Sequence, residues 1–263
     1  MAESHPTAYP DVNAVLNELL WNAQAILGDQ WVGMVLYGSL ALGDFSTESS
    51  DVDFLVVTAA EPADETVRAL AVMHTRIAAI GSKWATELEG SYIPRDALRR
   101  YDPSRARHPH IDRGHNGEGL VVRHHDCDWV IQRRTLREHG VVLAGPAPKT
   151  MIDPVLPDDL RQATLSILQG WWTLMLDDPA PLRSTGYQAY AVLTMCRMLY
   201  TLQSGIIVSK PTAGQWAKAA LEERWAGLIE RALAWRHGAP FEGLNGTLDF
   251  IRYTLETSRS SVR

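Results

Sequence analysis

Residues 32–57 read VGMVLYGSLALGDFSTESSDVDFLVV, and this stretch decides the fold that we expect for the rest of the chain. An apolar run that ends at Tyr37 is followed by Gly38-Ser39, and a polar, turn-rich segment then leads to Asp51 and Asp53. A second apolar run, FLVV, comes directly after them. Short apolar runs between turn residues are typical of buried strands. The stretch therefore predicts a strand, a turn that begins a helix, a loop, and a second strand with two carboxylates at its start.

The spacing of the two carboxylates indicates their chemistry. Residues two apart in a strand point to the same face, so Asp51 and Asp53 are expected to lie side by side while Val52 faces the core. Neighbouring carboxylates repel each other unless a cation lies between them, and Mg²⁺ takes oxygen ligands and leaves positions for phosphate oxygens. Gly38 permits close approach of the backbone, and the Ser39 hydroxyl with nearby N–H groups can hold phosphate. The stretch therefore predicts a site for Mg²⁺ and a triphosphate.

A Gly-Ser turn, a loop and then Asp-x-Asp on a strand resemble the polymerase-β-like nucleotidyltransferase superfamily. Gly38-Ser39 and the pair Asp51 and Asp53 carry this resemblance. It implies an α+β fold whose N-terminal domain has a mixed sheet with helices. The alternative is that Asp51 is an ordinary loop carboxylate and that Asp53 is a solvent-facing strand residue.

Composition and charge narrow the class of protein. Of the 263 residues, 46% are hydrophobic and 21% are charged, which is typical of globular proteins with one large domain or two ordinary ones. The formal net charge of −6 and the pI of about 5.8 argue against nucleic-acid binding, which usually needs a broad basic surface. We therefore expect a small acceptor, and a cationic one suits this charge.

The sequence also bears on the compartment of the protein. It holds no apolar run of about 18 residues, and its first residues, MAESHPTAYP, lack a basic start followed by an apolar core. Cys127 and Cys196 lie far apart, so reduced thiols are expected. We expect a cytoplasmic monomer that does not contact membranes.

Strand and helix patterns alternate in the first part of the chain, and only helical patterns follow. The strands are expected over 31–37, 52–57, 84–93, 120–122 and 140–145, with helices over 11–27, 62–80 and 127–138 and a polar loop over 102–118. Four prolines in residues 146–157 mark a boundary between domains 1–155 and 156–263. Helices are expected over 158–176, 187–203 and 244–257, with one long helix or two over 212–237. This order predicts an α/β domain followed by a helical bundle, in an α+β fold overall.

A third carboxylate is expected from residues 84–93, WATELEGSYI. Alternation along a strand places Glu87 and Glu89 on one face, so geometry alone does not choose between them. A carboxylate here can take the proton from an acceptor hydroxyl, or it can help to hold a metal ion. The alternative for either residue is an exposed glutamate on the strand surface.

Arg197 is the only charged residue in the apolar helical segment 190–202, YAVLTMCRMLYTL. Arginine is rarely buried without an anionic partner. Lys210 follows this helix after a glycine and a short apolar run, so the two cations can converge on one anion. Phosphate is the natural candidate, because arginine binds it through two donors and lysine as a point charge. The alternative is that Arg197 pairs with an internal carboxylate and that Lys210 is merely exposed.

Four blocks in the same order are similar to the aminoglycoside (3″)(9) adenylyltransferases, the enzymes that modify streptomycin and spectinomycin. The blocks are VLYGSLALGD with SDVDFLVV, LEG, DWVIQRRTLREHGVVLAGP, and VLTMCRMLYTLQSGIIVSK. The resemblance spans most of the chain. It implies an antibiotic-resistance enzyme that transfers AMP from ATP, with Mg²⁺, to a hydroxyl of an aminoglycoside-type acceptor and releases pyrophosphate.

The resemblance also implies roles for individual residues. The family's catalytic-base glutamate lies in an L-E motif, which favours Glu89 over Glu87. The implied catalytic and metal-binding residues are Asp51, Asp53 and Glu89. The implied nucleotide-binding residues are Gly38, Ser39, Arg197 and Lys210.

The acceptor half of the resemblance departs from the family's pattern. Family members that modify streptomycin present an acidic residue and a histidine before the arginine, where this chain has Tyr187 and Tyr190. The tryptophan expected in the middle loop has no counterpart between Trp84 and Trp129. Trp172 is either an aromatic drug contact or a helix-core residue. Modification of spectinomycin alone, or of a different hydroxyl, is therefore compatible with the sequence.

Three alternatives stay open at this point. The chain can be a nucleotidyltransferase for another small molecule or for a protein hydroxyl, or a non-catalytic nucleotide sensor, although the intact carboxylates disfavour the sensor. His115, His124, His125 and Cys127 can also be drawn as a zinc site, but their spacing matches no common zinc finger. We expect a polar active-site loop there instead.

Overall fold

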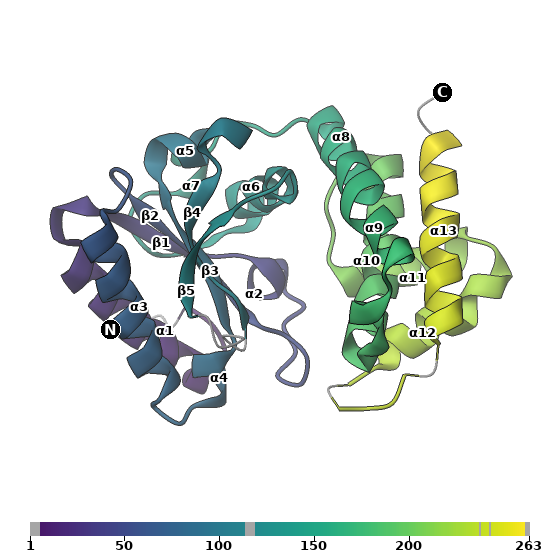
Figure 1. The fold of residues 1–263 in the computed structure, drawn as a ribbon, viewed down its shortest axis with the longest axis horizontal. Helices are drawn as coiled ribbons and strands as arrows, with labels where there is room; N and C mark the ends of the chain where they lie inside the picture. Colours follow the sequence, from purple (N-terminus) through teal and green to yellow (C-terminus); the bar gives the residue numbers. More distant parts are fainter. Residues whose placement is uncertain (1–5, 114–118, 237, 242, 261–263) are drawn as a thin grey trace. The chain divides into compact units, whose positions relative to one another are not determined.

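The structure is a computed structural model, and it describes residues 6–113, 119–236, 238–241 and 243–260 (Figure 1). The chain divides into two compact units. The first unit comprises residues 1–46 and 50–154, and the second comprises residues 47–49 and 155–263. The first holds a mixed sheet with helices and the second is mostly helical, so the predicted α+β fold is confirmed.

In the described part of the first unit, the strands form one six-stranded sheet in the order β5-β4-β3-β2-β1-β6. The strands are β1 (Trp31–Leu36), β2 (Val52–Thr58), β3 (Leu88–Pro94), β4 (Arg107–Ile111), β5 (Leu120–His124) and β6 (Val141–Ala144). Strands β2 and β3 are parallel, and the other neighbours are antiparallel. The parallel pair at the centre brings the starts of β2 and β3 to the same edge of the sheet.

Helices cover both faces of this sheet (Figure 1). One face packs on α1 (Pro10–Leu27) and α3 (Asp64–Ala78), and the other packs on α5 (Arg95–Arg99), α6 (Asp128–His139) and α7 (Pro148–Met151). Alternation along β2 sends Phe54 to the first face and Leu55 to the second, and both are fully buried. A strand that is buried on both faces reads as a continuous apolar run, which explains the run FLVV.

The third strand begins later than we predicted. Residues Lys83–Thr86 form a short helix, α4, and β3 starts only at Leu88. The Ser82 hydroxyl accepts a hydrogen bond from the Trp84 backbone N–H at 3.3 Å and so caps this helix. The prediction of a strand over 84–93 was therefore wrong for its first four residues, because the cap, and not side-chain alternation, decides the local structure.

The expected polar loop over 102–118 contains a strand, β4, so this prediction was also wrong. The sequence of β4, RHPHI, has no strand periodicity, but its backbone pairs with β3 on one side and with β5 on the other. The Ser91 hydroxyl on β3 is hydrogen-bonded to His110 Nδ1 at 2.8 Å. Contacts with residues distant in sequence therefore make this polar segment a strand. Residues 114–118 lie outside the described residues.

The second unit packs its helices around one apolar core. The helices are α8 (Pro157–Ile167), α9 (Thr173–Asp177), α10 (Thr185–Ser204), α11 (Lys210–Ala220), α12 (Ala226–Ala234) and α13 (Leu244–Ser260). The predicted helix over 158–176 is interrupted by a π-helical turn, Leu168–Trp172. The segment 212–237 forms two helices, one of the two expected outcomes.

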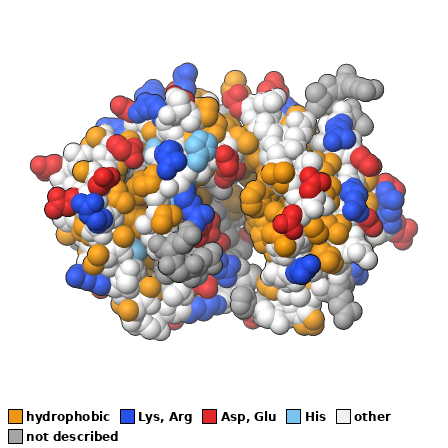
Figure 2. Space-filling model, in the orientation of Figure 1, with side chains coloured by type: hydrophobic (Ala, Val, Ile, Leu, Met, Phe, Trp, Pro, Cys, Tyr) orange, Lys and Arg blue, Asp and Glu red, His pale blue; other side chains and the backbone are white. Residues whose placement is uncertain are grey.

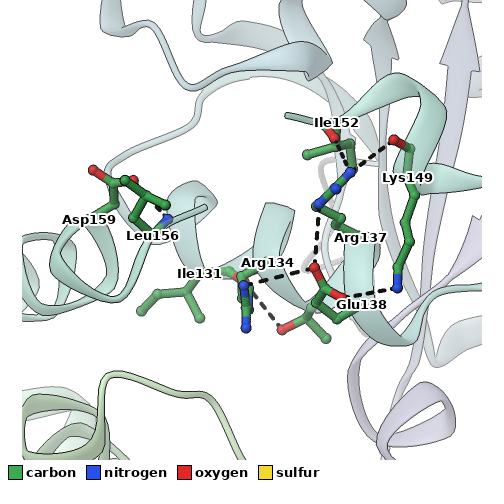
Figure 3. Close-up of polar contacts among 9 residues, drawn as sticks. Ile131, Arg134, Arg137, Glu138, Lys149, Ile152, Leu156 and Asp159 are labelled. Carbon is green, nitrogen blue, oxygen red and sulfur yellow. Dashed lines mark hydrogen bonds and ion pairs between the residues drawn. The ribbon is translucent and has the colours of Figure 1, made fainter. Parts of the chain in front are cut away.

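The chain leaves the first unit through a segment that is tied to α6 (Figure 3). The Arg137 guanidinium group donates hydrogen bonds to the backbone oxygens of Lys149 at 2.8 Å and Ile152 at 2.6 Å. The Glu138 carboxylate forms an ion pair with Lys149 Nζ at 3.1 Å. Beyond this segment, the Leu156 N–H donates to the Asp159 carboxylate at the start of α8. The backbone is therefore held at both sides of the boundary that follows residue 154.

No helix in the described ranges combines the length and the apolar character that a transmembrane span requires.

Candidate active site

The turn after β1 brings the backbone of Gly38 against the Asp53 carboxylate. Gly38 has a positive φ of 60°, and a Cβ atom added to it would lie 1.7 Å from Asp53 Oδ2. The N–H of Tyr37 also donates to the backbone oxygen of Asp53 at 3.1 Å. The first residue of α2 (Gly38–Leu42) is therefore a glycine for two reasons, its backbone conformation and the space that Asp53 occupies.

Strand register brings Asp53 and Glu89 together. Asp53 on β2 is the direct partner of Glu89 on the parallel strand β3. Register partners in a sheet project to the same face, so the two carboxylates are neighbours. Both side chains are half-buried. Asp51 lies one residue before β2 and two residues before Asp53, which is the spacing that puts two residues of an extended segment on the same face.

Glu87 is placed differently from Glu89. It lies before β3, at the end of α4, and it forms an ion pair with Arg113. Its backbone oxygen accepts a hydrogen bond from the N–H of Val52 at 2.8 Å. The expected face shared by the two glutamates is not formed, because β3 begins only after Glu87.

The pKa of a buried tyrosine is shifted by the charges of these carboxylates. Tyr37 is 3% exposed. Burial raises the pKa of Tyr37, and the charges of Asp53, Glu89 and Asp51 raise it further. The three predicted carboxylates therefore act on one side chain, which indicates that they share a neighbourhood.

Asp128 is a fourth carboxylate in this neighbourhood, and we did not predict it. It is the first residue of α6, and its charge also raises the pKa of Tyr37. Burial raises the pKa of Asp128 itself to about 6, and the neighbouring charge of Asp126 adds to the effect. No spacing rule links residue 128 to residues 51–53, because only the packing of α6 on the sheet brings them close.

The donor set suits a hard cation. Carboxylate oxygens are the ligands that Mg²⁺ prefers, and the ion usually keeps waters and substrate phosphate oxygens as further ligands. The Ser39 hydroxyl oxygen is buried and has no hydrogen-bond partner within the described chain, as expected for a group that meets a ligand oxygen. In the described ranges, no group of three or more His, Cys, Asp or Glu side chains is placed so that it could hold a metal ion.

The cations predicted from the helical half lie on two neighbouring helices of the second unit. Arg197 is in α10 and Lys210 is the first residue of α11. Both side chains are partly exposed, so Arg197 is less buried than its apolar surroundings in sequence suggest. Lys210 Nζ lies 4.1 Å from the centroid of the Tyr190 ring.

The aromatic residues of the second unit separate into core and surface. Trp172 is 1% exposed, which identifies it as a helix-core residue. Trp171 and Leu174 are 54% and 64% exposed, and Figure 2 shows apolar side chains gathered around α9. Tyr187 and Tyr190 form a pair with ring centroids 5.4 Å apart.

His108 and His110 of β4 cluster with His125, which directly follows β5. The His125 ring stacks on Trp129 at a centroid distance of 4.0 Å, and its Nε2 is 3.2 Å from the Ser91 hydroxyl. His108 is 2% exposed and contacts the His125 ring. His115, one of the four residues of the zinc alternative, lies outside the described residues. Burial lowers the pKa of His108 to about 4 and that of His125 to about 2.

These pKa shifts predict that the chain loses stability in mild acid. In the unfolded state a histidine titrates near its usual pKa of about 6.5, so the stabilisation is complete above that pH and is lost as the pH falls toward the folded-state pKa. For His108 alone, the loss between about pH 7.5 and pH 5 amounts to about 2 kcal/mol. We expect His108→Gln to reduce this acid dependence in denaturant titrations, whereas His139→Gln, at an exposed position, should keep it. An unchanged pH profile in His108→Gln would contradict the prediction.

Gly38→Ala is expected to disrupt the carboxylate site. The new methyl group would displace the Asp53 side chain, and the positive φ adds a cost of about 1–2 kcal/mol. Gly43→Ala is a matched control, because Gly43 has a φ of 77° but nothing lies within 4 Å of an added Cβ. Thermal unfolding should show a loss in both variants, and Mg·ATP binding should weaken only in Gly38→Ala. Equal binding by the two variants would show that Asp53 tolerates the methyl group.

The sheet has a Gly-Ser turn at the start of α2 and carboxylates at the starts of β2 and β3, which is the arrangement of a nucleotidyltransferase. Residues 23–89 match the family model of the nucleotidyltransferase domain. Residues 150–258 match the model of the aminoglycoside adenylyltransferase C-terminal domain. The chain is therefore similar in both parts to the aminoglycoside (3″)(9) adenylyltransferases, which confirms the resemblance that its four sequence blocks indicated.

Individual relatives agree with this assignment. An aminoglycoside (3″)(9) adenylyltransferase from Shigella flexneri is 26% identical over 228 residues, which are 84% of each chain. A spectinomycin 9-adenylyltransferase from Campylobacter jejuni is 24% identical over 222 residues, which are 82% of each chain. The fold is similar to the crystal structure of spectinomycin adenyltransferase AAD(9) from Enterococcus faecialis with ATP and spectinomycin. That similarity has a TM-score of 0.75 at 17% identity and covers 92% of this chain and 98% of the other.

Proposed function

We propose that the chain transfers AMP from ATP to a hydroxyl group of an aminoglycoside-type antibiotic, spectinomycin or streptomycin or both, and so confers resistance. The observation that carries the proposal is the direct pairing of Asp53 with Glu89 beside the Gly38-Ser39 turn. The names of the relatives supply the acceptor class. Since ATP is a cytoplasmic substrate, we place the reaction in the cytoplasm.

In this proposal, some site residues bind ATP and Mg²⁺, and one transfers a proton. We assign phosphate binding to the Ser39 hydroxyl in the first unit, and to Arg197 and Lys210 in the second unit, because a hydroxyl, a guanidinium and an ammonium group all donate hydrogen bonds to phosphate oxygens. Asp51 and Asp53 would hold Mg²⁺, with Glu89 as a further ligand. When bound, Mg²⁺ supplies charge neutralisation at the phosphate oxygens.

Glu89 serves as general base in this proposal. Its carboxylate takes the proton of the acceptor hydroxyl, and the hydroxyl oxygen forms a bond to the α-phosphorus of ATP. The bond between the α-phosphorus and the oxygen that bridges to the β-phosphate breaks, and pyrophosphate leaves with the electron pair. Positioning of the two substrates and neutralisation of charge provide most of the acceleration in such transfers.

The acceptor is tested by pyrophosphate release from Mg·ATP with streptomycin, spectinomycin and unrelated aminoglycosides. Release with either of the first two drugs supports the proposal and identifies the acceptor. If no drug of the panel causes pyrophosphate release while ATP still binds, the proposal of an antibiotic acceptor is overturned. Labelled ATP with lysate proteins would then test a protein hydroxyl, and ATP binding without any turnover would indicate a nucleotide sensor.

A further inference from the structure

The Tyr190 ring lies against the ammonium group of Lys210 in the second unit. Lys210 Nζ is 4.1 Å from the centroid of the ring, which is the geometry of a cation–π contact. Tyr190 belongs to the second turn of α10, and Lys210 begins α11, so the contact joins two helices. The negative face of an aromatic ring attracts an ammonium group and restricts where that group lies.

Two other aromatic side chains flank the Tyr190 ring, which is 41% exposed. Its centroid is 6.5 Å from that of Trp172, with an angle of 27° between the planes, and 5.4 Å from that of Tyr187. Trp172 is 1% exposed and ends the π-helical turn of residues 168–172. Trp172 and Tyr187 therefore restrict the space that is open to the Tyr190 ring on the side that faces them. Turns of this kind are frequent at functional sites.

Arg197 lies on the same side of α10 as Tyr190. The two residues are seven positions apart, and since a helix has about 3.6 residues per turn, they project in nearly the same direction. The ring of Tyr190 therefore holds the Lys210 ammonium group on the side of α10 that also carries Arg197. Two cations brought to one side repel each other, and the negative ring face offsets part of that repulsion.

We propose that Tyr190 is a positioning residue for the triphosphate of ATP, which acts by holding the Lys210 ammonium group where it meets the phosphate oxygens. This inference rests on the proposed function, in which Arg197 and Lys210 bind the triphosphate. The role belongs to the face of the ring and not to its hydroxyl, because a phenylalanine ring attracts cations in the same way. Without the ring, the long lysine side chain gains rotamers that it must lose again on binding.

The test is a double-mutant cycle on the affinity for Mg·ATP, measured by calorimetry without any acceptor. Tyr190→Leu is expected to raise the Kd about three- to tenfold, and Tyr190→Phe should restore it to within about twofold. In a Lys210→Met background, Tyr190→Leu should have no further effect, because the cation that the ring holds is gone.

Tyr200→Leu is the matched control. Tyr200 lies in the same helix and packs edge-on against Trp216 at 5.2 Å, so the variant also removes a packed ring from α10. It should leave the Kd unchanged. Thermal unfolding of each variant reports whether the helical unit is still folded.

Two results would overturn the inference while the proposed function stands: an unchanged Kd in Tyr190→Leu, or an equal loss with and without Lys210. A loss in Tyr190→Phe as large as in Tyr190→Leu would assign the effect to the hydroxyl and overturn it as well. Failure of the unmodified chain to bind Mg·ATP would overturn the proposed function together with this inference.

Discussion

Glu89→Gln is expected to lower the kcat of AMP transfer by about 10²- to 10⁴-fold, the usual contribution of a general base. The amide keeps the size of the side chain but cannot accept the proton of the acceptor hydroxyl. Glu89 is the base that the family's L-E motif implies, and strand register places it directly beside Asp53. Steady-state pyrophosphate release with the acceptor that the drug panel identifies measures the effect.

Glu87→Gln is the control for this experiment. Glu87 lies two residues away and carries the same charge, but it is engaged with Arg113 and precedes the strand. Its replacement should leave kcat nearly unchanged. A larger loss in Glu87→Gln than in Glu89→Gln would reverse the assignment of the base. A weaker affinity for Mg²⁺ in Glu89→Gln, together with the fall in kcat, would add metal binding to its role.

Asp53→Asn is expected to abolish the stabilisation of the chain by Mg·ATP. A ligand at about 100 times its Kd stabilises a protein by about 2.7 kcal/mol, which for a chain of this size raises Tm by about 5–10 °C. We expect this rise in the unmodified chain only when ATP and Mg²⁺ are both present. The neutral amide at position 53 removes the charge that attracts the cation, so the shift should disappear and turnover should fall by at least about 10²-fold.

Asp64→Asn makes the same change in net charge in the first turn of α3, and it should keep the full Tm shift. The comparison separates the local role of Asp53 from a general effect of charge on the binding of an anion. An equal shift in Asp53→Asn and in the unmodified chain would refute metal binding at Asp53. A shift with ATP alone would show that nucleotide binding does not depend on Mg²⁺.

Local sequence patterns predicted the main elements of both units. The run before Gly38 became β1, the run after Asp53 became β2, and the stripe before Gly28 became α1, because periodicity and turn residues act over a few neighbouring positions. These patterns failed where a helix cap or a pairing strand competes with them. Residues 83–86 became a helix and residues 107–111 became a strand for those reasons.

The sequence by itself determined the class of the protein, because Gly38-Ser39, Asp51 and Asp53 stand within one local stretch that resembles the polymerase-β-like nucleotidyltransferases. The tertiary structure alone decided how other residues join them. Parallel register puts Glu89, and not Glu87, beside Asp53, and the packing of α6 adds Asp128 to the same neighbourhood. In the helical unit, the tertiary structure places the Lys210 ammonium group against the Tyr190 ring. These contacts depend on strand register and helix packing between segments distant in the chain, which no local periodicity encodes.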